Sequence, residues 1–183
     1  QSMNRLDVDT AAALLKSGNP KARAGALRAI YYTAAENERA LELASSAVRD
    51  PHPQVRLWAV SVLAQLDSPD TVKLALQALE GIEVDEFLDF AIWSICREHE
   101  ARWIELTKTG NPFENLNQLV FAVRALNKPI AIPTIREALV AGEFESIESV
   151  EKVADWIAKV GSPADLDVLV NYALEQKASP MKQ

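Results

Sequence analysis

The sequence predicts an all-α fold, specifically a right-handed α-α superhelix of about five helix pairs with one extra capping helix at the N-terminus. Three observations lead to this prediction. Ala and Leu dominate while Gly accounts for only 6 of 183 residues, which favours helices. A helix-length apolar pattern recurs about every 33 residues. No stretch sustains the alternation of apolar and polar residues that indicates a strand.

The elements follow in order along the chain. Residues 4–17 are expected to form the capping helix. Five helix pairs should then cover residues 19–49, 53–80, 85–109, 115–142 and 146–176. Two helices of this length cannot bury their apolar faces alone, so neighbouring pairs must stack into one continuous core. We therefore expect a single repeat domain over residues 1–183. Because the chain begins Gln1-Ser2-Met3, we also expect it to be excised from a larger protein.

The repeat is clearest between "NPKARAGALRAIYYTA" (Asn19–Ala34) and "HPQVRLWAVSVLAQL" (His52–Leu66). The aligned positions are Pro20 with Pro53, Arg23 with Arg56, Ala26 with Ala59, and Ile30 with Leu63. A further step of 32 places Val55, Ala59 and Leu63 on Phe87, Ala91 and Ile95. Later copies surround Ala122 and Leu126, and then Ala154 and Ala158.

A proline marks the turn between the two helices of several pairs, at Pro69, Pro129 and Pro163. Proline fits the first turn of a helix, where its missing N–H is not needed. Ser68 and Ser162 precede two of these prolines and are expected to act as N-caps.

The stretch "DPHPQVRLWAVSVLAQLDSPDTVKLALQAL" (Asp50–Leu79) resembles a HEAT repeat: Asp-Pro, Val-Arg, a helix-A alanine, and a proline that opens helix B. The resemblance implies a HEAT-like, armadillo-like solenoid in which the B helices line the concave side. It also implies that Arg23 and Arg56 reach acidic groups across repeat boundaries, with Asp50 and Asp67 as candidate partners. The third unit lacks the Asp-Pro and Val-Arg marks, and the fourth matches less well.

A narrower resemblance covers residues 19–142. "DEFLDFAIWSICREHEARWIELTKTG" (Asp85–Gly110) and the segments around it resemble the HEAT region of large planctomycete-type exported proteins. In those proteins the repeats lie between a dehydrogenase-like β-propeller and a c-type cytochrome domain. This resemblance implies an extracytoplasmic linker or docking module, periplasmic or beyond, within a parent that can be a dehydrogenase-like enzyme.

The stretch Asp85–Glu100 carries the candidate interaction surface. At about 100° per residue, Phe87, Leu88, Ala91, Ile92, Ile95 and Cys96 share one wide core face of a helix. The opposite side carries a mixed stripe of Glu86, Asp89, Phe90, Trp93 and Arg97. Because Trp and Arg often dominate binding energy, this stripe is a candidate recognition surface, and Trp103 is added to it. The preferred interpretation is structural, with Phe90 and Trp93 packed on a neighbouring repeat.

Other reactive-looking residues are interpreted as structural. Asp85 and Asp89 lie on an exposed helix rather than in the water-poor cleft that acid–base catalysis needs. Cys96 and His99 form Cys-x-x-His, which supplies too few ligands for a metal, so Cys96 should be buried and His99 should lie near the helix end. Trp58, Trp103 and Trp156 are expected in the core. We expect no catalytic residues, metal or cofactor.

The chain carries a net charge of −7, which disfavours binding to nucleic acid or anionic lipid, and no apolar run is long enough to insert into a membrane. The function expected is therefore a non-catalytic protein-interaction or interdomain scaffold. Its partner would be another domain of the same chain or a separate protein. The alternative is a HEAT-like enzyme, such as a DNA glycosylase or a pigment lyase.

Overall fold

Short side-chain caps and prolines fix where the first helices begin. The computed structural model describes residues 8–34, 38–80, 84–144 and 147–178. Asn19 caps α2 by accepting a hydrogen bond from the backbone N–H of Lys21 at 3.0 Å, and Pro20 occupies the first turn. His52 caps α4 in the same way through Nδ1, which accepts from the N–H of Gln54 at 3.3 Å. The Asn-Pro and His-Pro pairs of the repeat are thus helix-starting signals.

The chain divides into two compact units, residues 1–99 and residues 100–183. The described helices of the first unit are α1 (Val8–Leu15), α2 (Pro20–Tyr31), α3 (Ala40–Ser45), α4 (Pro53–Ala64), α5 (Thr71–Leu76), the 3-10 helix η2 (Gln77–Glu80) and α6 (Glu86–Glu98). Those of the second are α7 (Glu100–Trp103), η3 (Ile104–Lys108), α8 (Leu116–Leu126), η4 (Pro129–Ala131), α9 (Ile132–Ala141), α10 (Ile147–Val160) and α11 (Pro163–Ala178).

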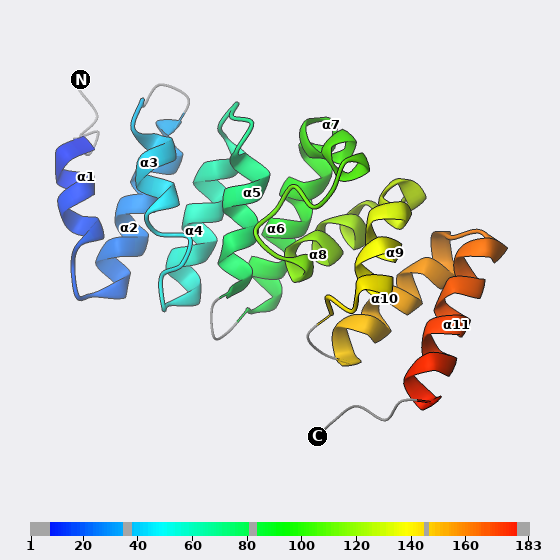
Figure 1. The fold of residues 1–183 in the computed structure, drawn as a ribbon. Coiled ribbons are helices and arrows are strands. Elements are labelled where there is room, and N and C mark those ends of the chain that lie inside the picture. Colours follow the sequence, from blue (N-terminus) through cyan, green and yellow to red (C-terminus); the bar gives the residue numbers. More distant parts are fainter. Residues whose placement is uncertain (1–7, 35–37, 81–83, 145–146, 179–183) are drawn as a thin grey trace. The chain divides into compact units, whose positions relative to one another are not determined.

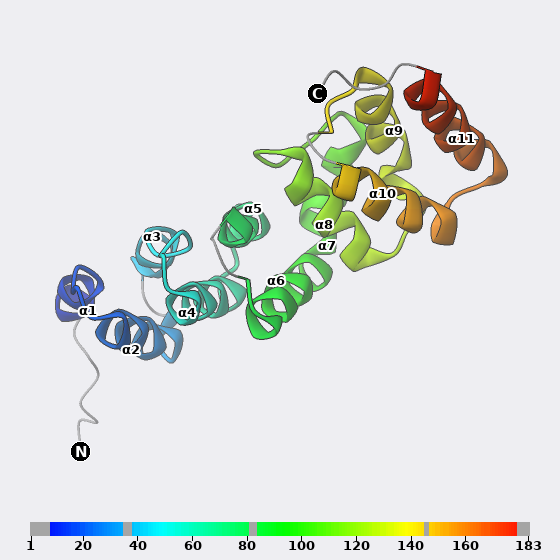
Figure 2. The same ribbon diagram turned by 90° about the horizontal axis from the view of Figure 1, so that it is seen from below.

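In the first unit the helices form two rows (Figure 1; Figure 2). One row contains α2, α4 and α6, in which α4 packs against both of its neighbours. The other row contains α3, which packs on α4, and α5, which packs on α4 and α6. The capping helix α1 covers α2. This is the arrangement of stacked helix pairs that the repeat predicted.

Equivalent repeat positions fill the core of this unit. Ile30, Leu63 and Ile95 are all buried, and so are Ala26 and Ala59. Small alanines at repeated positions let neighbouring helix backbones approach closely, while the branched residues fill the space between the rows. The periodicity read from the sequence therefore corresponds to the core.

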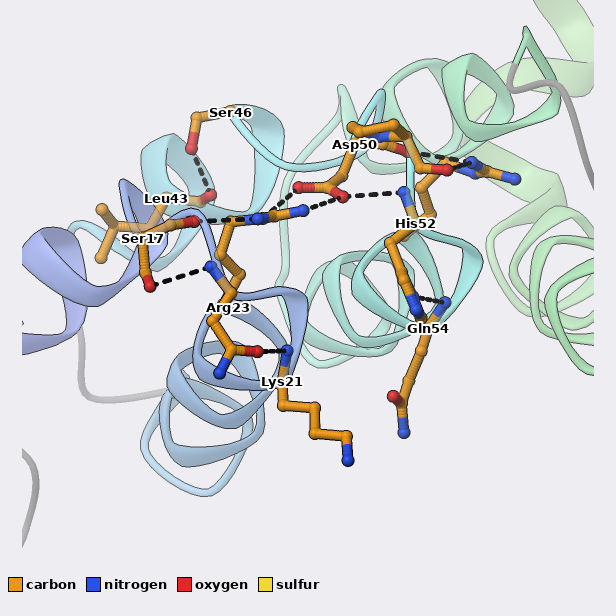
Figure 3. Close-up of polar contacts among 11 residues, drawn as sticks. Ser17, Lys21, Arg23, Leu43, Ser46, Asp50, His52 and Gln54 are labelled. Atoms are coloured by element: carbon orange, nitrogen blue, oxygen red, sulfur yellow. Dashed lines mark hydrogen bonds and ion pairs between the residues drawn. The ribbon is translucent and has the colours of Figure 1, made fainter.

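An ion pair joins the first two repeats. Arg23 on α2 donates to both carboxylate oxygens of Asp50, at 2.6 and 2.8 Å, and also to the carbonyl of Ser17 at 2.8 Å (Figure 3). Asp50 in turn accepts from the backbone N–H of His52 at 2.9 Å. Burial would raise the pKa of Asp50, but the hydrogen bonds from Arg23 and His52 hold that pKa below its usual value. The expected partnership of Arg23 and Asp50 is confirmed.

Arg56, which aligns with Arg23, behaves differently. Its side chain is completely buried and its Nη1 donates to the backbone carbonyls of Asp50 at 2.9 Å and Pro51 at 3.4 Å. Its Nε and Nη2 make no hydrogen bond among the residues that the structure describes. Arg56 thus ties the start of α4 to the preceding turn, through carbonyl groups rather than through Asp50 or Asp67 carboxylates.

The second unit contains paired helices as well. In it α8 packs on α10, α9 packs on α11, and η3 packs on η4 and α9. The hydroxyl of Thr134 donates to the carbonyl of Thr107, which links α9 to η3. At the start of α11, Ser162 donates to the Asp165 carboxylate through its N–H at 2.9 Å and its hydroxyl at 2.6 Å. These hydrogen bonds lower the pKa of Asp165. The Ser162 hydroxyl also accepts from the N–H of Asp165 at 3.4 Å, which confirms Ser162 as a cap.

The predicted all-α class is confirmed, since the residues described form helices and no strand. Two details differ from the expectation. The third helix pair, expected at residues 85–109, is divided between the units, because α6 belongs to the first and α7 to the second. Pro69 lies in the turn before α5, whose N-cap is Asp70, so this proline precedes the helix instead of occupying its first turn.

Candidate interaction surface on α6

Helix α6 is well defined at both ends. The Asp85 carboxylate caps its start by accepting from the N–H of Leu88 at 2.8 Å, and Glu86 and Asp89 place negative charge in the first turn. Arg97 lies in the last turn and His99 is the C-cap. Both charge placements oppose the helix dipole, so they stabilise α6. The expected position of His99 at the helix end is confirmed.

The buried face of α6 consists of Leu88, Ile92, Ile95 and Cys96. Burial raises the pKa of the Cys96 thiol far above its usual range, so the sulfur stays protonated and non-nucleophilic at neutral pH. The interpretation of Cys96 as a small buried apolar residue is therefore confirmed.

The predicted burial of Phe87 is wrong. The repeat alignment placed this residue in the core with Val55, but its side chain is 64% exposed. Val55 is buried because α4 packs against α2 on one side and α6 on the other. Within its own unit α6 ends the row and packs on α4 and α5. Among the described helices of this unit none follows α6 in the row, so Phe87 lacks the second neighbouring helix that Val55 has.

The opposite side of α6 presents the predicted stripe, and we call Glu86, Asp89, Phe90, Trp93 and Arg97 the α6 stripe. Phe90 is 65% exposed and Trp93 is 36% exposed. Their rings stack with centroids 5.8 Å apart and planes inclined by 18°. The guanidinium of Arg97 lies 4.6 Å from the centre of the Trp93 ring. The stripe is thus an ordered stack of Phe, Trp and Arg at the surface.

The preferred structural interpretation of these aromatics is wrong. It required Phe90 and Trp93 to pack into a neighbouring repeat, whereas both side chains are exposed. Stacking on each other and under Arg97 removes only part of their apolar surface from water. A surface cluster of Trp, Phe and Arg has the composition that dominates binding energy at protein interfaces.

Trp103 does not belong to the stripe. It ends α7 in the second unit and is only 3% exposed, with its ring 5.4 Å from that of Phe113. Its inclusion as an interaction residue is wrong, while its expected place in the core is confirmed. Trp156 is also buried.

A groove in the first unit escaped the sequence analysis. It has a volume of about 390 Å³ and runs between α4 and α6, lined by Tyr31, Trp58, Ser61, Gln65, Ser94 and Glu98 among others. Trp58 is half-buried there, with the ring of Tyr31 at 5.9 Å and the guanidinium of Arg28 at 5.8 Å. The sequence does contain one sign of this groove, the aromatic pair Tyr31-Tyr32 at the end of α2. Tyr31 lies 27 positions before Trp58.

In the first unit, all the large apolar side chains exposed in its described part lie on the row of α2, α4 and α6 or at its edge: Tyr32, Phe87, Phe90 and Trp93. The B helices α3 and α5 contribute none. The resemblance to HEAT repeats implied that the B helices line the concave side and would form the binding side. The stacked aromatic side chains instead favour the α6 end of the row of α2, α4 and α6.

The remaining candidates for chemistry are structural. His52 caps α4 and His99 ends α6. Over residues 8–34, 38–80, 84–144 and 147–178, no three His, Cys, Asp or Glu side chains gather as metal ligands would. None of the helices in these ranges is both long and apolar enough to cross a bilayer.

Comparison with known proteins agrees with this architecture. The family described as HEAT repeats matches residues 8–95, which span α1 to most of α6. No curated protein matches the chain. No solved structure matches it either. Over residues 8–95 the stacked pairs of the first unit are thus similar to HEAT repeats, in agreement with an all-α, HEAT-like solenoid fold.

Proposed function

We propose that the chain is a non-catalytic protein-interaction scaffold and that the α6 stripe is its contact surface. The observation that supports this most directly is the stacked, exposed cluster of Phe90, Trp93 and Arg97. Rigid aromatic side chains that are already ordered lose little conformational entropy on binding. HEAT repeats commonly serve as scaffolds for protein interaction, so the fold and the surface agree.

The charges of the stripe favour a protein over a polyanion. Glu86 and Asp89 precede the aromatics and Arg97 follows them, so the surface carries both signs within one helix. A nucleic-acid groove needs a surplus of positive charge to release counterions, and the chain as a whole carries −7. The alternative of a DNA glycosylase predicts salt-dependent DNA affinity, and a chain with no such affinity would exclude it.

The test starts with a photo-crosslinking amino acid in place of Phe90, which labels the protein that contacts this position in cells. The purified partner is then titrated with the chain by calorimetry. Trp93→Ala should weaken binding by about 30-fold or more, because interface tryptophans are frequent hot spots. Tyr32→Ala is the matched control: this aromatic is 69% exposed but is the C-cap of α2 and lies outside the α6 stripe, so its loss should leave the affinity unchanged. Equal affinities for the wild type and Trp93→Ala would contradict the proposal.

Within this role, the resemblance of residues 19–142 to exported proteins suggests a more specific task. The module would dock a c-type cytochrome domain beside a dehydrogenase-like domain of the same parent chain. The parent sequence tests this idea, since haem attachment requires Cys-x-x-Cys-His. A full-length parent that contains no such motif would exclude the cytochrome partner and leave the scaffold role intact.

A further inference from the structure

The side chains along the α6 stripe are arranged so that two copies of the helix, placed antiparallel, would be complementary to each other. Glu86, Phe90, Trp93 and Arg97 lie at i, i+4, i+7 and i+11, within roughly 60° of arc at 100° per residue. Read from either end, the pattern is charge, aromatic, aromatic, charge, with opposite charges at the two ends. A twofold axis between residues 91 and 92 would therefore exchange Glu86 with Arg97 and Phe90 with Trp93.

From this pattern we infer that the occupant of the α6 stripe is a second copy of the chain, with the two α6 helices antiparallel across a twofold axis. The inference rests on the proposed function and names its partner. In such an isologous contact each residue pair occurs twice. Glu86 of each copy faces Arg97 of the other, and Phe90 of each copy faces Trp93 of the other.

The geometry of α6 suits this pairing. Positions 86 and 97 are separated by about 16 Å along the helix, so the two charge pairs flank the aromatic centre on both sides. Antiparallel helices pack with axes roughly 8–10 Å apart, which brings four aromatic rings together between them. Phe90 and Trp93 already stack on each other, with their planes inclined by only 18°, so each copy offers an ordered aromatic pair to the other. The guanidinium of Arg97 lies over the Trp93 ring, 4.6 Å from its centre, and a guanidinium carries several N–H groups that can donate to carboxylates.

The contact should be weak. One helix of about 20 Å presents less surface than the roughly 800 Å² per partner of a standard stable interface. Two chains that each carry −7 also repel each other. A dissociation constant on the order of tens to hundreds of micromolar follows from such a small contact.

Charge reversal tests the pairing with the full chain in analytical ultracentrifugation. Wild type should change from monomer to dimer as its concentration rises to about 500 µM. Glu86→Arg alone and Arg97→Glu alone place like charges opposite each other twice, so each should weaken the dimer at least about 10-fold. An equimolar mixture of the two variants restores both opposite-charge pairs and should dimerise like wild type. Glu98→Arg, at an exposed position of α6 outside the stripe, is the matched control and should dimerise normally.

Each outcome decides the matter. Dimerisation that is lost in both single variants and recovered in their mixture supports the inference. A wild-type monomer at all concentrations, or a dimer that neither variant weakens, overturns it. In the first of these cases a partner that binds through Trp93 would still support the scaffold role. If the wild type stays monomeric and Trp93→Ala lowers the melting temperature by several degrees, the stripe would instead pack within the chain. That result would contradict both the dimer and the scaffold role.

Discussion

At the scale of single residues, the Arg23–Asp50 pair shows what the repeat signature stabilises. Both side chains are mostly buried, and Asp50 accepts hydrogen bonds from Arg23 and from the N–H of His52. One carboxylate thus orients the end of one repeat and the first turn of the next. This explains in physical terms why Asp-Pro precedes α4 and Arg occurs in α2.

The pair should contribute measurably to stability. Arg23→Ala should lower the free energy of unfolding by about 2 kcal/mol, between the small value of exposed pairs and the 3–5 kcal/mol of buried ones. Arg39→Ala is the control, since Arg39 pairs with the exposed side chains of Asp9 and Glu42, and its loss should cost clearly less stability than the loss of Arg23. Urea unfolding followed by circular dichroism measures both. Equal losses would show that burial of the Arg23 pair adds nothing.

The same pair makes stability depend on pH. Because the pKa of Asp50 is lowered in the folded state, its contribution is fully present above the unfolded pKa of about 4 and is lost as pH falls through the folded value. The difference in unfolding free energy between wild type and Asp50→Asn should therefore shrink as pH is lowered from about 5 to about 2. Unfolding curves at several pH values check this. A difference that stayed constant over this window would contradict the assigned ionisation.

At the scale of elements, the sequence predicts which residues face inward only where neighbours enclose a helix on both sides. Ile30, Leu63 and Ile95 were assigned correctly because their spacing defines one face of each helix. Phe87 was not, because its burial depends on how many helices surround α6 rather than on its position in the repeat. The exposure of Phe90 and Trp93 has the same tertiary cause. The groove beside Trp58 was missed because its lining comes from several helices.

The start of α6 offers a local test. Asp85→Ala removes the side chain that accepts from the N–H of Leu88 and should cost about 1 kcal/mol of stability. Asp85→Asn should retain most of that stability, since asparagine caps about as well as aspartate. Thermal unfolding compares the two. If both variants lost the same amount, the charge of Asp85 would matter more than its cap.

At the scale of the whole molecule, the division into residues 1–99 and residues 100–183 is the feature that the sequence did not reveal. The apolar spacing of the repeat continues from α2 to α6. The third pair lacks the Asp-Pro and Val-Arg marks, but its sequence shows no boundary between its two helices. The division follows from how contacts group within each unit, and single-sequence periodicity does not encode those contacts.

This division predicts that the first unit folds by itself. A fragment of residues 1–99 should be helical and unfold cooperatively, because α1 covers one end of its stack and its core residues lie within the fragment. Circular dichroism and urea titration measure this, with the intact chain as reference. A fragment that shows no cooperative transition would mean that residues 100–183 are needed to complete its fold.

The single cysteine of the chain gives α6 a built-in reporter. Cys96 is completely covered on the face where α6 packs on α4 and α5. A disulfide reagent in the solvent can then reach its sulfur only when that helix lifts away from the stack or the whole unit opens. The rate of thiol modification in the native protein therefore measures how often the last helix of the first row detaches, with no engineered probe.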